Sequence, residues 1–192
     1  MKATPARRPG ILRKLKKPIE FLKILFAWVV VGAILVWSKP NPAQFWLGSG
    51  CFCIAQILRV WAAGHLRRGA VLTTDGPYAY VRDPLYLGRL FWVLGLGFYS
   101  GQPWIGLALL AIFLWFYCRK KIPKEMKNLE KLFGKPYLQY CAEVRSLLPR
   151  LRPYPHRAGN RWQWSVFREN KEIWSVLIVA AVIALFGAKT FQ

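Results

Sequence analysis

Residues 76–88 read Gly-Pro-Tyr-Ala-Tyr-Val-Arg-Asp-Pro-Leu-Tyr-Leu-Gly, a polar loop that runs directly into an apolar segment. Gly76-Pro77 is a turn signal. Pro84 disfavours a helical conformation at Asp83 and suits the first turn of a helix. Asp83 is therefore expected to be the N-cap, with its side chain accepting hydrogen bonds from amides of that turn. The stretch predicts a loop at a water interface, followed by a helix that enters apolar surroundings.

Apolar segments on both sides of this loop predict a membrane protein. The chain has 192 residues, of which 55% are hydrophobic and 16% aromatic. A helix needs roughly 20 apolar residues to cross the hydrocarbon core. Five segments are candidates, namely Ile19–Ser38, Ala43–Ala63, Leu85–Ser100, Trp104–Cys118 and Ile173–Gly187. The expected fold class is an all-α integral membrane helical bundle of about five transmembrane helices, with a cytoplasmic amphipathic-helix segment.

The distribution of charge predicts the orientation. The chain carries 29 Lys and Arg against 8 Asp and Glu, a formal net charge of +21. The basic residues gather in the N-terminal tail, the 64–84 loop and residues 119–172, whereas the short loops at 39–42 and 101–103 carry only Lys39. The positive-inside rule places the basic segments and the N-terminus in the cytoplasm. Anionic lipid headgroups, and not nucleic acid, are the expected partners. Short loops and no recognisable targeting peptide favour a bacterial inner membrane, with the endoplasmic reticulum as the alternative.

We expect one membrane domain over residues 1–192. Its expected parts are a basic cytoplasmic tail, a four-span bundle, an interfacial segment and a last span, at residues 1–18, 19–118, 119–172 and 173–189. Within the interfacial segment, Lys124–Lys135 has apolar residues on one helical face and predicts an amphipathic helix that Gly134 ends. A second short helix is expected over Tyr137–Leu147. The basic and aromatic stretch Arg161–Lys171 suits the headgroup region.

The residue types of the 76–88 loop are suited to ligand binding. Tyr78, Tyr80, Arg82 and Tyr86 bring hydroxyls, a guanidinium and ring faces to one membrane depth. Such a niche could hold a carboxylate or stack an adenine, but the same residues could also serve only to start a helix. From the residues alone, both interpretations stay open. No metal site is expected, because the four cysteines are spaced like free thiols and the chain has two histidines.

Two motifs resemble the family of isoprenylcysteine carboxyl methyltransferases and phospholipid N-methyltransferases. The family's loop usually reads Gly-Pro-Tyr-x-x-x-Arg-His-Pro-x-Tyr-x-Gly, and this chain differs from it by having Asp83 in place of His. A second family pattern, Glu-Glu-x-x-Leu-x-x-x-Phe-Gly-x-x-Tyr-x-x-Tyr, is matched from Glu125 to Tyr140, with Met126 in place of the second Glu. The resemblance extends over residues 55–150.

The resemblance implies transfer of a methyl group from S-adenosylmethionine to a lipophilic acceptor, either a prenylcysteine-like carboxylate or a phospholipid amine. It implies that the cofactor-binding residues are Tyr78, Val81, Arg82, Asp83, Pro84, Tyr86, Gly88, Gly95, Gly97, Glu125, Leu129 and Tyr137. Glu125 would hold the amino group of the cofactor. The candidate catalytic residues are Arg82, Asp83 and His65, the last as the base that an amine acceptor would need.

Several residues have a simpler structural interpretation. Gly95 and Gly97 could serve helix packing, and Glu125 could pair with a neighbouring lysine on a solvated face. Arg59, near the end of a span, is either functional or extends to the interface. The whole chain could be a non-catalytic lipid-binding or scaffold protein with a degenerate site. A reductase of sterol-like lipids is a third alternative, but no glycine-rich phosphate-binding motif supports it.

Overall fold

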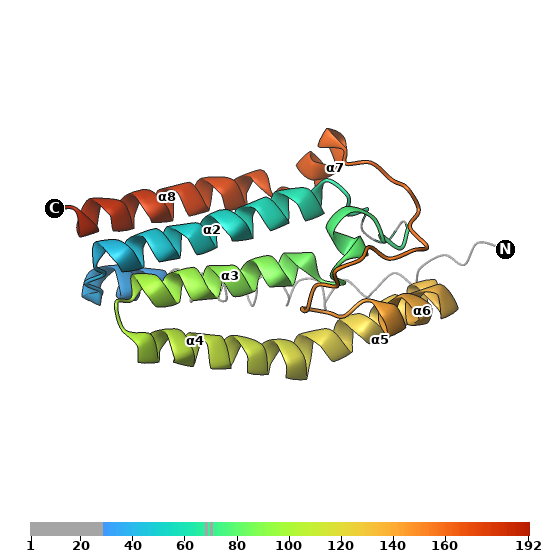
Figure 1. Cartoon of the computed structure of the whole chain (residues 1–192), viewed down its shortest axis with the longest axis horizontal. Helices are drawn as coiled ribbons and strands as arrows, with labels where there is room; N and C mark the ends of the chain where they lie inside the picture. Colours follow the sequence, from blue (N-terminus) through green and yellow to red (C-terminus); the bar gives the residue numbers. More distant parts are fainter. Residues whose placement is uncertain (1–28, 68, 70) are drawn as a thin grey trace, which may run out of the picture. The chain divides into compact units, whose positions relative to one another are not determined.

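The computed structural model describes residues 29–67, 69 and 71–192, and all regular structure in these residues is helical (Figure 1). A helix over residues 29–37 belongs to a compact unit that ends at Trp37, and a second unit spans Ser38–Gln192. The second unit contains α2 (Pro42–Ala63), a 3-10 turn η1 (Gly76–Ala79), α3 (Pro84–Tyr99), α4 (Pro103–Phe116), a π-helical turn η2 (Tyr117–Lys121), α5 (Ile122–Phe133), α6 (Lys135–Glu143), α7 (Trp164–Glu169) and α8 (Ile173–Thr190).

The all-α class that the sequence predicts is confirmed. The basic tail and the first half of the first predicted span fall at residues 1–28, outside the described residues. The single-domain organisation stays a prediction. All the helices α2 to α8 lie in the unit Ser38–Gln192.

Local sequence explains where the helices of this unit begin. In α2 the Asn41 side chain accepts from the Gln44 amide at 2.8 Å, and the Gln44 side chain accepts from the Asn41 amide at 3.0 Å. This reciprocal pair is a capping box, which satisfies two amide donors that a helix start would otherwise leave without partners. Helices α2, α3 and α4 each have proline in the first helical position, where its missing N–H removes no hydrogen bond.

The core of the bundle forms where α2 packs against α3 and α8. Tyr99 of α3 stacks between Phe45 of α2 and Phe186 of α8, with ring centroids 5.7 and 4.5 Å away. Its hydroxyl lies 2.7 Å from Ser49 Oγ. A side chain at Gly48 would reach within 2.5 Å of the Tyr99 ring. Small residues on α2 therefore allow the close helix approach that buries this tyrosine.

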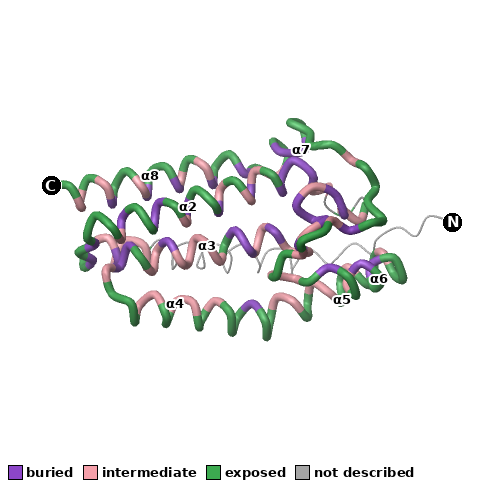
Figure 2. Tube along the Cα trace, viewed as in Figure 1, coloured by how far each residue is buried: buried purple, intermediate pink, exposed green. Residues whose placement is uncertain are grey.

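Two of the described helices, α2 and α8, are long and apolar enough to cross a membrane. Helices α3 and α4 have 16 and 14 residues, fewer than the roughly 20 of a typical span. Helix α4 has no buried residue, and its exposed large apolar side chains include Trp104, Leu107 and Ile112 (Figure 2). That exposed apolar surface suits lipid, but the count of five spans stays a prediction.

The helix does not end at Cys118, the last residue of the fourth predicted span, and where that span leaves the membrane stays a prediction. Helix α4 continues through the π-helical turn η2 into α5 without a loop. The amphipathic helix predicted over Lys124–Lys135 is α5, and it ends at Gly134, whose φ of 58° few other residues adopt. π-Helical turns inside longer helices often lie at functional sites. This one buries Tyr117 beside the loop that precedes α3.

The segment 145–163, which we call the strap, runs along the 75–83 loop and holds it in place. Four main-chain hydrogen bonds of 2.8–3.1 Å join the two segments, from Arg82 N to Arg145 O, Asp83 N to Ser146 O, Arg150 N to Tyr80 O and Tyr154 N to Ala79 O. The buried Asp75 carboxylate also accepts from Gly159 N at 2.8 Å and from Asn160 Nδ2 at 2.9 Å. No pattern in the sequence predicted this pairing.

Candidate active site

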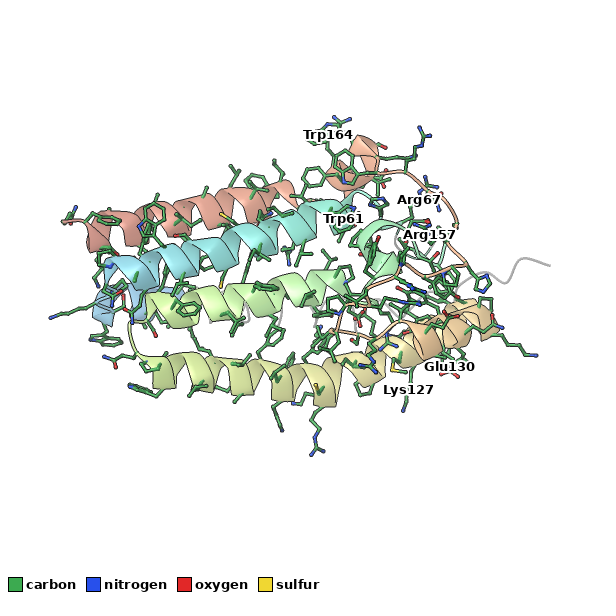
Figure 3. All side chains as sticks on the ribbon, in the orientation of Figure 1. Trp61, Arg67, Lys127, Glu130, Arg157 and Trp164 are labelled. Atoms are coloured by element: carbon green, nitrogen blue, oxygen red, sulfur yellow. The ribbon has the colours of Figure 1, made fainter. Side chains whose placement is uncertain are left out.

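A cavity of about 380 Å³ opens where the loop between α2 and α3 faces α5 and α6. Its lining comes from three stretches that are far apart in the sequence. They are six described residues of the loop after α2 (66, 67, 69 and 71–73) together with residue 78, residues at the start of α3 between 82 and 89, and residues of α5 and α6 between 125 and 140. The volume lies within the roughly 300–1,000 Å³ typical of small-molecule sites. Figure 3 shows polar side chains crowded at this end of the bundle, near the labelled Arg67.

Eight of the predicted site residues line this cavity together. They are Tyr78, Arg82, Asp83, Pro84, Tyr86, Glu125, Leu129 and Tyr137. The first five come from the 76–88 loop and the start of α3, and the last three come from α5 and α6. The two sequence motifs therefore face each other across one cavity, although some 40 residues separate them in the chain.

Asp83 does not use its side chain as the N-cap that the sequence predicts. It occupies the N-cap position of α3 but makes no side-chain capping bond. Its Oδ2 accepts from Ser146 Oγ and lies 3.6 Å from Arg82 Nε. The strap supplies Ser146, whose Oγ also lies 3.0 Å from the Tyr117 hydroxyl. Tertiary partners thus replace the helix amides, and the carboxylate holds the Arg82 guanidinium at the cavity wall.

The charge of Arg82 is maintained although the side chain is half-buried. Burial alone would lower its pKa, but Cys141 and Asp83 nearby give a net rise above the usual value. The guanidinium therefore remains a fixed cation with hydrogen-bond donors on the cavity wall.

Glu125 faces the cavity and is held there by a tyrosine. Tyr86 Oη donates to Glu125 Oε2 at 3.1 Å. No salt bridge among the described residues involves Glu125. The predicted alternative, pairing with Lys121 or Lys124 on a solvated face, is therefore not what the structure contains. Met126, at the position of the family's second Glu, packs instead against an apolar cluster that contains Tyr137 and Tyr140.

Thr73 provides independent support for a ligand in the cavity. Its side chain lines the cavity, and its Oγ1 is buried without a hydrogen-bond partner among the described residues. A buried hydroxyl without a partner is energetically unfavourable, and native proteins rarely leave one. A polar ligand in the cavity would satisfy it.

Five other predicted site residues do not line the cavity. The His65 ring lies against Gly76, with Nδ1 3.0 Å from the Trp61 carbonyl oxygen, and Val81 is buried in the loop. The three glycines of α3 face neighbouring helices, Gly88 against Arg59, Gly95 against Phe52 and Gly97 against Gly106. Their roles in cofactor binding or catalysis stay predictions without geometric support from the cavity.

Substituting Gly97 by Ala should destabilise the fold and leave ligand affinity unchanged. A Cβ at this position would lie 2.9 Å from the Gly106 main-chain Cα, so α3 and α4 would have to separate. We expect the midpoint of thermal unfolding in detergent to fall by several degrees, from a penalty of about 1–3 kcal/mol. Gly50→Ala is the matched control, because its Cβ would meet nothing within 4 Å. Equal midpoints for the two variants would contradict the packing role.

Arg59 neither extends to water nor lines the cavity. Its side chain is 8% exposed, and its Nη2 and Nε lie 2.6 and 3.1 Å from Glu172 Oε2 at the start of α8. The guanidinium also lies 4.9 Å from the centre of the Trp92 ring of α3. This buried pair joins three helices, so Arg59 does not extend to the interface as one of the two interpretations had it.

Sequence reasoning missed several cavity residues. They include Arg67, Thr73, Arg89, Phe133 and Tyr140. Helical spacing could have indicated two of them, since Arg89 follows Tyr86 by three residues and Phe133 follows Leu129 by four, on the same helix faces. Arg67 and Thr73 lie in an irregular loop with no periodic signal.

Buried tyrosines predict how stability changes at alkaline pH. Burial raises the pKa of Tyr140 well above its usual value, and the nearby Asp83 charge acts in the same direction. The unfolded chain ionises its tyrosines near pH 10, whereas folded Tyr140 keeps its proton and donates to the Tyr78 carbonyl at 2.6 Å. The contribution of Tyr140 to the free energy of unfolding is therefore fully present below about pH 10. It is lost as the pH rises toward the pKa of Tyr140 in the folded protein.

We expect the unfolding midpoint to decline above about pH 10, with about 1 kcal/mol from Tyr140 at pH 11. Thermal melts at several pH values should show a shallower decline for Tyr140→Phe than for the wild type. Parallel pH profiles for the two proteins would contradict this role.

The sequence of this chain is similar to those of several known proteins. The profile of the phospholipid methyltransferase family matches residues 43–136. A probable protein-S-isoprenylcysteine O-methyltransferase of Oryza sativa subsp. indica is 35% identical over 142 residues, which cover 73% of this chain and 72% of that protein. The protein-S-isoprenylcysteine O-methyltransferase of Schizosaccharomyces pombe is 33% identical over 112 residues, covering 52% of this chain and 47% of that protein.

The chain therefore spans about half the length of the yeast relative. A solved structure of the eukaryotic intramembrane Ras methyltransferase ICMT aligns with a TM-score of 0.47 at 22% identity, covering 71% of this chain and 54% of that chain.

Proposed function

The chain belongs to the superfamily of membrane methyltransferases that contains the isoprenylcysteine carboxyl methyltransferases and the phospholipid methyltransferases, and we propose that it transfers a methyl group from S-adenosylmethionine to a lipophilic acceptor. One observation carries the proposal. The two motifs that define the resemblance line a single cavity, which presents a carboxylate, guanidinium groups and a buried hydroxyl that has no hydrogen-bond partner among the described residues.

The cavity residues fit the polar groups of S-adenosylmethionine. Glu125 would accept from its ammonium group, and Arg82 or Arg67 would hold its carboxylate. Thr73 Oγ1, which has no partner within the part of the chain that the structure describes, would gain one. Tyr78, Tyr137 and Phe133 offer ring surfaces for a flat adenine. When bound, the cofactor supplies an electrophilic methyl group on a sulfonium. The residues of the chain bind and align it and exclude water from the cavity.

The charges around the cavity support a carboxylate acceptor over an amine. Arg67, Arg82 and Arg89 line the cavity against Asp83 and Glu125, so the lining carries an excess of positive charge. An acceptor that is already anionic at neutral pH is attracted to such a site and needs no base. An amine would first have to lose a proton, but His65, the predicted base, is turned toward Gly76 and does not line the cavity.

We place the cavity at the cytoplasmic face of the membrane in which α2 and α8 are embedded. The basic segments of the chain would lie on that side, facing anionic headgroups, and an apolar acceptor would enter from the bilayer. The bacterial inner membrane and the cytoplasmic N-terminus remain our predictions, and so does a membrane lipid or other lipophilic molecule as the acceptor.

The test is transfer of a labelled methyl group by the purified full chain. Protein in lipid nanodiscs receives labelled S-adenosylmethionine and either an S-prenylated N-acetylcysteine or a phosphatidylethanolamine. We expect label in the prenylcysteine ester and none in the phospholipid. Label only in the phospholipid would overturn the carboxylate assignment. If the folded protein binds S-adenosylhomocysteine but methylates neither acceptor, the proposed cofactor site is retained and both acceptors are excluded.

A non-catalytic membrane protein is the alternative. Its expected result is an absence of S-adenosylhomocysteine binding in calorimetric titrations of folded protein.

A further inference from the structure

Helix α7 lies at the level where two membrane-spanning helices end. Helix α2 ends at Ala63 and α8 begins at Ile173. Asn170 Nδ2 donates to the Ala63 carbonyl at 2.9 Å, and Gln163 N donates to Gly64 O at 3.0 Å. These bonds also satisfy carbonyls that the end of α2 would otherwise leave without partners. The ends of the two spans therefore fix α7 at the boundary between membrane and water.

An aromatic cluster covers this boundary. The rings of Trp162, Trp164 and Phe167 pack together with centroid distances of 5.1–5.9 Å, and those of Trp164 and Phe167 are stacked. The inner side of the cluster is docked on α2, because Trp162 Nε1 donates to the Val60 carbonyl at 3.1 Å and Phe167 is buried. The outer side is open, with Trp164 55% exposed. Figure 3 shows Trp164 on α7, at the edge of the bundle.

Basic residues flank the exposed aromatic residues in the sequence. Arg161, Arg168 and Lys171 are exposed, and none of them takes part in a salt bridge among the described residues. Of the two acidic residues in this stretch, Glu169 is exposed and Glu172 is buried against Arg59. The surface is therefore cationic and aromatic. It suits an anionic partner at the depth of the lipid headgroups.

We propose that Arg161–Trp174, the α7 platform, binds the headgroups of anionic phospholipids in the leaflet where α2 ends. The indole rings lie at headgroup depth, where tryptophan is favoured, and the three basic side chains contact the phosphates. The platform overlaps the end of the strap, whose Gly159 and Asn160 hold Asp75 at the start of the 75–83 loop. Lipid bound here tethers the strap to the membrane surface. The binding itself does not depend on methyl transfer.

The experiment measures lipid selectivity of the full chain reconstituted in phosphatidylcholine bilayers. Trace spin-labelled phosphatidylglycerol or phosphatidylcholine reports the fraction of each lipid that the protein immobilises. The variant R161Q/R168Q/K171Q removes the charges of the α7 platform. The matched control K127Q/K131Q/K135Q removes three exposed charges from α5 and α6. We expect the platform variant to lose selectivity for phosphatidylglycerol at least about threefold, and the control to lose much less.

Equal losses in the two variants would overturn the proposal, because net charge and not the platform would then set the selectivity. No loss in the platform variant would also overturn it, because its charges would then not bind the lipid. Retained thermal unfolding midpoints show that both variants are folded. Should the triple variant not fold, R161Q/R168Q against K127Q/K131Q tests the same point and leaves the left-handed turn at Lys171 (φ 56°) intact. Selectivity in the wild type should also fall with added salt, since screening weakens exposed charge interactions.

Discussion

Replacing Glu125 by Gln weakens the binding of S-adenosylhomocysteine about 30-fold, in the result that we expect from calorimetric titration of the detergent-purified chain. The substitution keeps the size of the side chain and removes the negative charge that would accept from the ligand's ammonium group. A hydrogen bond between charged partners contributes about 1.5–3 kcal/mol, and 2 kcal/mol corresponds to about 30-fold in affinity. Glu125 already faces the cavity, held by Tyr86 at 3.1 Å, so the site needs little rearrangement to use it.

Glu130→Gln is the matched control. Glu130 lies on the same helix, is exposed and does not line the cavity, so its substitution should leave the affinity unchanged. Tyr86→Phe removes only the donor that orients Glu125 and should give a smaller loss than Glu125→Gln. Equal affinities for Glu125→Gln and Glu130→Gln, with saturable binding in both, would mean that the ligand's amino group is bound elsewhere.

The largest effect on stability is expected from the buried pair between Arg59 and Glu172. Glu172→Gln removes the carboxylate charge opposite a guanidinium that is 8% exposed. Removing one partner of a buried ion pair typically destabilises a protein by about 3–5 kcal/mol, because the remaining charge stays out of water. For a chain of this size we expect the midpoint of thermal unfolding to fall by roughly 10 °C. Intrinsic tryptophan fluorescence in detergent micelles measures it.

The double variant Arg59→Met/Glu172→Gln should recover part of this loss, since it removes both charges and keeps apolar volume. Glu143→Gln is the matched control. It breaks the more exposed pair between Arg150 and Glu143 at 3.4 Å, and such pairs contribute less than about 1 kcal/mol. A midpoint for Glu172→Gln within 2 °C of this control would be incompatible with a buried pair that secures α8.

The structure also clarifies the departures from the family pattern. Asp83 replaces a usual His, and its carboxylate is engaged by Ser146 and Arg82. Met126 replaces a usual Glu, packs against an apolar cluster and does not itself line the cavity. The sequence suggested that both changes could mean a degenerate site. The geometry supports a different interpretation, in which Asp83 positions Arg82 and the loss of the second Glu leaves Glu125 in place.

Much of the local structure could be predicted because its causes are local. Prolines at the first helical position and the positive φ of Gly134 act within a few residues, so the starts of α2, α3 and α4 and the end of α5 follow from the chain itself. The motifs likewise identified eight residues of the cavity. The continuous passage from α4 into α5 escaped prediction, because the basic residues Arg119–Lys121 resemble the end of a span.

The sequence by itself determined the all-α class, the positions of most helix ends and the two motifs that meet in the cavity, because periodicity, proline and glycine act over one or two helical turns. Only the tertiary structure decided which side chains face the cavity and which partners they take. Asp83 finds Ser146 across 63 residues, and Arg59 finds Glu172 across 113. Such partners depend on how the strap and α8 fold back on the bundle, and no local pattern encodes a contact over that separation.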